Sequence, residues 1–81
     1  MDALHLNVIS PEKEIFDGEV SSVTLPGALG LFTILPQHAP IVSSLSAGRL
    51  SYTTADGEEH AQDIQGGFIE MNSNIVSVCI E

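Results

Sequence analysis

Apolar side chains recur at every second position in parts of this chain, and this spacing restricts the fold more than any other feature. Within residues 4–8 the apolar positions are Leu4, Leu6 and Val8, and the same alternation returns over residues 76–80. Successive side chains of a strand point to opposite faces, so a period of two predicts strands with one buried face.

Turn-forming residues interrupt the chain at short intervals. Seven such points occur in the 81 residues: Ser10-Pro11, Asp17-Gly18, Pro26-Gly27, Ala47-Gly48, Asp56-Gly57, Gly66-Gly67 and Asn72-Ser73-Asn74. They leave segments of roughly 4–8 residues, which suit strands and are too short for helices. We therefore predict an all-β meander. With no helix to cover an apolar face, its strands must pack as two sheets or close into a barrel.

Two hairpins are predicted with definite boundaries. Residues 50–54 should pair with 59–64 through Asp56-Gly57, because this dipeptide accepts the positive φ angles that match the twist of paired strands. Residues 67–71 should pair with 75–80 through the Asn-rich turn between them, because Asn also adopts left-handed geometry.

The segment 26–40 is apolar and also rich in strand breakers. Its glycines allow a tight loop, and its three prolines lack a backbone donor, which suits sheet edges and rigid loops. We expect Leu29 and Leu31 to lie in a loop. Apolar side chains on a loop gain by leaving water, so both are candidates for a contact with another protein.

The charge balance excludes nucleic acid as a partner. The chain has 11 acidic and 2 basic side chains, a formal net charge of −9, and two isolated cations cannot neutralise a phosphate backbone. Hydrophobic residues make up 43 % of the chain, which is typical of a folded domain rather than an acidic tail. A chain this short builds one core, so we expect a single domain over residues 1–81.

The cysteine count and the hydropathy indicate the kind of compartment in which the chain works. Cys79 is the only cysteine, which excludes an internal disulfide and favours a reducing compartment. No apolar run approaches the ~18 residues of a membrane span, so we expect no direct membrane insertion.

No group of residues predicts catalysis. Ser, His and Asp occur without the context of a nucleophile motif, and the glycines of 27–30 are not followed by the Lys-Ser/Thr of a phosphate loop. The acidic run 56–60 could bind a metal, but at a hairpin tip a solvated charge cluster is the ordinary finding.

His38 is either an interface residue or a loop histidine bonded to backbone. A small-molecule- or metal-binding β module remains an alternative, although it needs an aromatic cleft, and we expect the four aromatic residues to lie in the core: Phe16, Phe32, Tyr52 and Phe68.

Longer strings in the sequence carry a family resemblance. They are Leu-Asn-Val-Ile-Ser-Pro at 6–11, Ile-Phe-Asp-Gly-Glu-Val at 15–20, Leu-Pro-Gly at 25–27, Gly-Leu-Phe-Thr-Ile-Leu-Pro-Gln-His-Ala-Pro at 30–40, Leu-Ser-Ala-Gly at 45–48 and Gly-Gly-Phe-Ile-Glu at 66–70. In order and spacing, residues 4–81 resemble the epsilon subunit of the F-type ATP synthase. The most specific element is Ile-Leu-Pro-x-His-x-Pro at 34–40.

The resemblance implies a flattened, ten-stranded β-sandwich of short antiparallel strands. In that family the domain has no active site and no cofactor. It belongs to the central stalk, or rotor, and links the gamma subunit to the c-ring, so that proton or sodium flow is coupled to ATP synthesis and hydrolysis on the alpha and beta subunits. In a bacterium this would place the chain at the cytoplasmic face of the plasma membrane.

The resemblance also assigns two interfaces. Residues of the family surface that meets the polar loops of the c-ring are Gly27, Ala28, Leu29, Gly30, Leu31, Gln37 and His38; residues of the surface against gamma are Ser10, Ala39, Pro40, Ile41 and Val42. Apolar residues occupy the 27–31 loop, where the family often has a carboxylate. Many members continue into a C-terminal helical hairpin that restrains ATP hydrolysis. Nothing in these 81 residues corresponds to it, and for a naturally short subunit we expect coupling without that inhibition.

Overall fold

The computed structural model describes residues 3–81, and every regular element in this range is a strand. The eight strands are β1 (Leu4–Ile9), β2 (Glu14–Gly27), β3 (Gly30–Ile34), β4 (Ile41–Leu45), β5 (Gly48–Thr54), β6 (Glu59–Ile64), β7 (Gly67–Asn72) and β8 (Ile75–Ile80). Both predicted hairpins are confirmed, since β5 pairs with β6 and β7 with β8 in antiparallel register.

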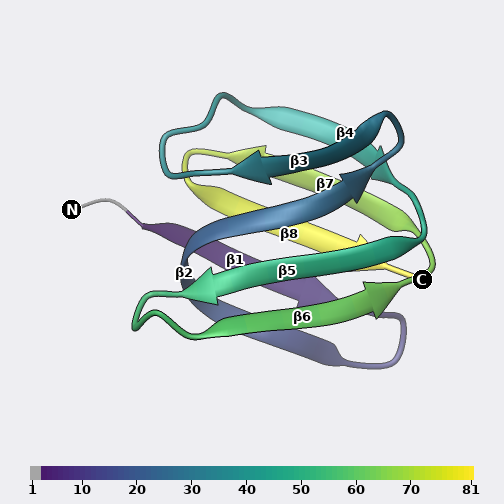
Figure 1. The fold of residues 1–81 in the computed structure, drawn as a ribbon, viewed down its shortest axis with the longest axis horizontal. Helices are drawn as coiled ribbons and strands as arrows, with labels where there is room; N and C mark the ends of the chain where they lie inside the picture. Colours follow the sequence, from purple (N-terminus) through teal and green to yellow (C-terminus); the bar gives the residue numbers. More distant parts are fainter. Residues whose placement is uncertain (1–2) are drawn as a thin grey trace.

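The strands form two layers that are joined through β2 (Figure 1). One layer, the front sheet, contains β3, the second half of β2, β5 and β6. The other, the rear sheet, contains β4, β7, β8, β1 and the first half of β2. The shortest dimension of the molecule is 18 Å, which fits two sheets about 10 Å apart with side chains on their outer faces.

The predicted all-β sandwich is confirmed, with two differences in detail. The described part of the chain has eight strands rather than ten. The pairing of β1 with β8 is parallel rather than antiparallel, with Leu6 opposite Val76 and Val8 opposite Val78. A parallel pair needs a long connection, and here the whole of β2 to β7 supplies it.

The predicted turn at Asp17-Gly18 is wrong, because both residues lie inside the 14-residue strand β2. Gly18 is opposite Leu6 of β1, and a Cβ on Gly18 would lie 3.1 Å from Cζ of Phe16. Glycine is therefore present to admit the Phe16 ring. The chain does not reverse here. After an irregularity at Val20, β2 changes its partner from β1 to β5, so one strand serves both layers.

The core lies between the two sheets and follows the predicted alternation. Its buried members are Leu4, Leu6, Val8, Val20, Val23, Leu25, Ile34, Leu45, Leu50, Tyr52, Ile64, Ile69, Met71, Val76, Val78 and Ile80, with Phe16 and Phe32 packed against them. The core prediction for Phe68 is wrong, because its side chain is 51 % exposed. Ile69 and Met71 point inward, so a period of two directs Phe68 outward.

Candidate protein interfaces

An exposed apolar stripe runs along the edge strand β3. Among the described residues, β3 pairs only with β2. Leu31 is 73 % exposed, and Leu35, just after the end of β3, is 55 % exposed. The two residues are four positions apart, so in extended chain their side chains point to the same face. Leu29, in the turn before β3, is fully exposed. We call Leu29, Leu31 and Leu35 the β3 stripe. The expectation of a loop holds for Leu29, whereas Leu31 lies in β3 opposite Pro26.

The turn that presents Leu29 is fixed by its surroundings. The Ala28 amide donates to the Ser44 carbonyl at 3.3 Å, and the Ser46 amide donates to the Pro26 carbonyl at 2.8 Å. A Cβ on Gly27 would lie 2.7 Å from the Phe32 ring, so only glycine fits there. These contacts tie the tip of the stripe to β4.

Gln37 and His38, between β3 and β4, form a tight corner. The His38 amide donates to the Leu35 carbonyl at 3.1 Å, and the His38 ring approaches the Ala39 carbonyl with its Nδ1 at 2.7 Å. A carbonyl only accepts, so Nδ1 carries a proton and Nε2 is the acceptor of the neutral ring. The bond to backbone is thus confirmed, and it fixes the orientation of an exposed imidazole.

The structure places the residues assigned to the c-ring in two groups. Residues 27–31 lie at one end of β3, and the Gln37–His38 corner lies beyond its other end (Figure 1). Five residues lie between the groups, the last three of β3 followed by Leu35 and Pro36, and they separate the groups by about 15 Å. Leu35, which the sequence interpretation missed, completes the stripe between them. The signal was present, since residues 31, 33 and 35 continue the alternation.

A second exposed apolar patch lies on the outer face of the rear sheet. Register places Phe68, Cys79 and Ile9 side by side across β7, β8 and β1. Val42 of β4 is diagonal to Phe68, a spacing that long side chains bridge. Exposed fractions are 73 % for Val42, 51 % for Phe68 and 37 % for Ile9. We call Ile9, Val42 and Phe68 the rear patch.

Of the residues assigned to gamma, one belongs to the rear patch, others lie at the ends of the rear sheet and one faces the core. Val42 belongs to it, and Ser10 follows Ile9 at one end of the sheet. Ala39 and Pro40 precede β4 and so lie at the opposite end. Ile41 is half-buried against the core and faces inward. Phe68 and Ile9 were missed, although the inward positions of Ile69 and Met71 would have placed Phe68 on this surface.

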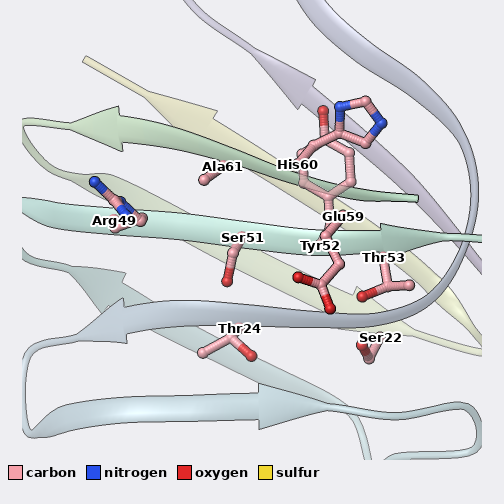
Figure 2. A pocket seen from close by; sticks show the side chains of 9 residues that line it. All are labelled: Ser22, Thr24, Arg49, Ser51, Tyr52, Thr53, Glu59, His60 and Ala61. Atoms are coloured by element: carbon pink, nitrogen blue, oxygen red, sulfur yellow. The ribbon is translucent and has the colours of Figure 1, made fainter. Parts of the chain in front are cut away.

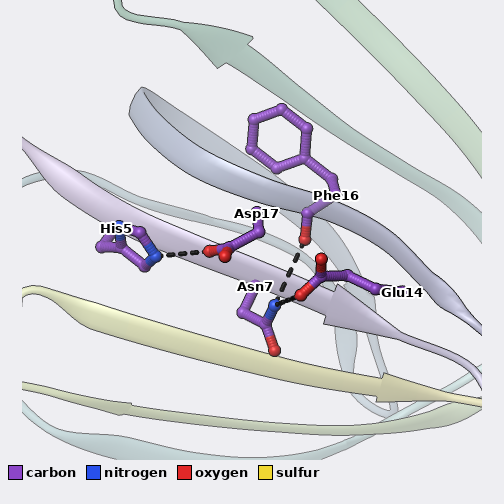
Figure 3. Close-up of polar contacts among 5 residues, drawn as sticks. All are labelled: His5, Asn7, Glu14, Phe16 and Asp17. Carbon is purple, nitrogen blue, oxygen red and sulfur yellow. Dashed lines mark hydrogen bonds and ion pairs between the residues drawn. The ribbon is translucent and has the colours of Figure 1, made fainter.

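Polar pairs hold β1 to β2 at the rim of the rear patch (Figure 3). Nε2 of His5 lies 2.5 Å from Oδ1 of Asp17, and the Asn7 amide donates to Glu14 at 2.9 Å and to the Phe16 carbonyl at 3.4 Å. Both members of the His5–Asp17 pair are about half exposed, so such a pair stabilises the fold by at most about 1 kcal/mol. Their effect is to support the register of the two strands.

A depression of about 530 Å³ lies on the outer face of the front sheet. Figure 2 shows its lining, which consists mainly of hydroxyl and charged side chains: Ser22, Thr24, Arg49, Ser51, Tyr52, Thr53, Glu59, His60 and Ala61. Tyr52 is only 9 % exposed, and its ring packs between Phe16 and His60. The depression therefore presents no open aromatic surface to a small molecule.

Metal-binding side chains do not converge in the described residues. Over residues 3–81, no three His, Cys, Asp or Glu side chains are grouped so as to hold a metal ion. In the same range, no helix has the length and apolar character that a membrane crossing requires.

Asp56, in the turn between β5 and β6, has a lowered pKa. The Thr54 hydroxyl donates to its carboxylate, and the Glu58 backbone adds a weaker effect in the same direction. Stabilisation from a carboxyl with a depressed pKa is present at neutral pH and is lost as the pH falls through that pKa.

We expect Thr54→Val to raise the pKa of Asp56 toward its ordinary value, because the largest cause of the shift is removed. Carboxyl-detected NMR titration measures this directly. Thr53→Val, at the neighbouring position that faces the other side of β5, is the control and should leave the pKa of Asp56 unchanged. An unchanged value in Thr54→Val would contradict the assignment.

Comparison with known proteins identifies the family. Residues 3–81 match the family model described as the ATP synthase Delta/Epsilon chain, beta-sandwich domain. The chain belongs to this family. It is 44 % identical over 75 residues to the ATP synthase epsilon chain of Leptospira borgpetersenii, covering 93 % of this chain and 58 % of that protein. It is 40 % identical over 72 residues to the epsilon chain of Chlorobium limicola, covering 89 % and 82 %.

The length and fold of the relatives complete the comparison. The chain spans 58 % of the Leptospira protein and the same share of the Xanthomonas euvesicatoria epsilon chain, to which it is 37 % identical over 81 residues. A chain of the Euglena gracilis mitochondrial ATP synthase structure, which contains OSCP, F1 and the c-ring, superposes with a TM-score of 0.92 at 22 % identity, covering 99 % of this chain and 51 % of that one. A chain of the Tetrahymena thermophila central stalk and c-ring structure gives 0.78 at 18 % identity, covering 95 % and 62 %. These two likenesses establish the fold.

Proposed function

We propose that this chain is a single, non-catalytic domain of an ATP synthase rotor, which links the gamma subunit to the c-ring. Ion translocation through the ring is thereby coupled to ATP synthesis or hydrolysis on the alpha and beta subunits, which the domain affects only indirectly. Membership of the epsilon family and bacterial relatives named ATP synthase epsilon chain support this role. They also support a peripheral position at the cytoplasmic face of the membrane.

One observation carries the proposal, namely the presence of two separate exposed apolar surfaces on opposite layers of one closed sandwich. A domain that couples two partners must bind both at once and must not deform between the two binding surfaces. The two layers share β2 and a common core, so force applied at one surface reaches the other through close-packed side chains.

We assign the β3 stripe and the Gln37–His38 corner to the c-ring. The stripe offers exposed leucines, and the corner adds an oriented imidazole. Segment 27–31 contains no carboxylate, so attachment there depends on apolar burial and hydrogen bonds rather than on ion pairs.

We assign the rear patch to gamma. Phe68 and Val42 provide the aromatic and aliphatic groups that are typical of the centre of a protein interface. Polar side chains of β1 and β2 lie on one side of the patch, and Glu70 and Ser44 lie opposite Val42 and Phe68, which is the usual composition of an interface rim. Ser10 at one end and Ala39 and Pro40 at the other would then lie at the margin of the contact.

Two double variants test both assignments against each other. Val42→Ser with Phe68→Ser should weaken binding to purified gamma by about 10- to 100-fold, since two exposed apolar anchors are removed. The same variant should bind the c-ring as the unmodified chain does. Leu29→Ser with Leu31→Ser should show the reverse pattern. Calorimetry with gamma and pull-down with detergent-solubilised c-ring measure the two affinities.

Measuring both double variants against both partners also gives the results that would contradict the proposal. Failure of the unmodified, folded chain to bind gamma, the c-ring or a complex of both would overturn the rotor role. Equal loss of both partners in either double variant would contradict the separation of the two surfaces.

A further inference from the structure

Asn74, in the turn between β7 and β8, connects three separate parts of the chain. Its carbonyl accepts the backbone amide of His5 at 2.8 Å, which aligns β8 with β1. Its side-chain Oδ1 accepts the backbone amide of Gln37 at 2.6 Å, across 37 positions in sequence. The turn of the rear sheet is thereby attached to the loop between β3 and β4, and both lie at the same end of the molecule (Figure 1).

The Gln37 backbone is a position that requires such support. Its φ angle is 68°, in the left-handed region that a residue other than glycine adopts at an energetic cost. Such conformations persist where the surroundings determine them. An amide donor requires an oxygen acceptor, so the bond also fixes the orientation of the Asn74 carboxamide.

We infer that Asn74 is a positioning residue, which holds the Gln37–His38 corner in the conformation that docks on the c-ring. Asn74 itself has a φ angle of 64°, and Asn adopts this geometry more readily than most residues do. One residue type thus meets two demands, a left-handed turn and an acceptor aimed at a neighbouring loop. A corner ordered before binding loses less conformational entropy on docking. The docking part of this inference rests on the proposed function.

The test separates the hydrogen bond from the turn. Asn74→Gly keeps the left-handed turn at no steric cost and removes the acceptor. Asn74→Asp keeps an oxygen at the same place and serves as the conservative rescue. Ser73→Gly is the matched control, because Ser73 lies in the same turn with φ of 52° and its hydroxyl bonds only to the adjacent Asn72 among the contacts that the structure records.

Two readouts are taken on each variant of the 81-residue chain. Amide hydrogen exchange at Gln37 reports the bond in the isolated protein, and pull-down with a detergent-solubilised c-ring reports docking. In Asn74→Gly we expect exchange at Gln37 to accelerate by about 3- to 10-fold, the range for loss of one hydrogen bond, and binding to weaken by a similar factor. Asn74→Asp and Ser73→Gly should remain close to the unmodified chain in both readouts.

The outcomes distinguish this inference from the proposed function. Unchanged exchange at Gln37 in Asn74→Gly would overturn the positioning role, whatever the ring does. Faster exchange with undiminished ring binding would overturn the link between the corner and docking. If the unmodified chain does not bind the ring, the docking part fails together with the proposed function, while Gln37 exchange still decides whether Asn74 holds the corner.

Discussion

Val78→Asp is expected to give a chain with no cooperative unfolding transition. The Val78 side chain is fully buried, and its strand neighbours Val8 and Ile69 are also fully buried. A carboxylate at this position would have no partner among apolar side chains, which costs several kcal/mol. A domain of this size has a stability of about 5 kcal/mol. Thermal denaturation followed by circular dichroism is the measurement.

Ser77→Asp is the matched control for that variant. Ser77 is the preceding residue of β8 and faces the outer side of the rear sheet. Its strand neighbour Glu70 adds a like charge, so we expect a loss of no more than about 1 kcal/mol and a cooperative transition. If Val78→Asp unfolded as cooperatively as Ser77→Asp, the inward orientation of this position would be contradicted.

Local rules in the sequence predicted the hairpins and the core. The Asp-Gly turn and the Asn-rich turn act through backbone conformations that depend on adjacent residues alone. The alternation over residues 4–8 and 76–80 likewise depends only on the geometry of a single strand. Such features can be predicted from the local sequence because no contact with a distant part of the chain is needed to form them.

Features that depend on contacts between distant parts of the chain could not be predicted from the sequence. Asp17-Gly18 has the composition of a turn, yet pairing with β1 keeps it extended and the Phe16 ring occupies the space above Gly18. The parallel pairing of β1 with β8 joins the two ends of the described chain. The contact between Asn74 and Gln37 likewise follows from the arrangement of the two layers rather than from either local sequence.

Leu31→Asp combined with His38→Asp is expected to weaken attachment to the c-ring by about 100-fold or more and to leave the fold intact. Leu31 is 73 % exposed and His38 is exposed, so in the free chain both carboxylates remain in water. On the proposed attachment by apolar burial and hydrogen bonds, at least one carboxylate would leave water in the docked state without an ion-pair partner, which costs several kcal/mol. About 3 kcal/mol corresponds to a 100-fold change in affinity. Pull-down with the c-ring and a thermal transition on the same sample are the measurements.

A control of equal charge makes this result specific. Ala55→Asp with Gln62→Asp also adds two acidic side chains, at exposed positions at the turn between β5 and β6 and on β6, away from β3. In a chain whose net charge is already −9, it reproduces any general repulsion from the ring, and we expect it to bind as the unmodified chain does. Equal weakening in both double variants would mean that long-range charge, rather than contact at the β3 stripe and the corner, determines attachment. Unfolding of Leu31→Asp with His38→Asp would mean that these side chains belong to the core. Specific loss with an unchanged transition therefore requires that at least one of Leu31 and His38 contacts the ring.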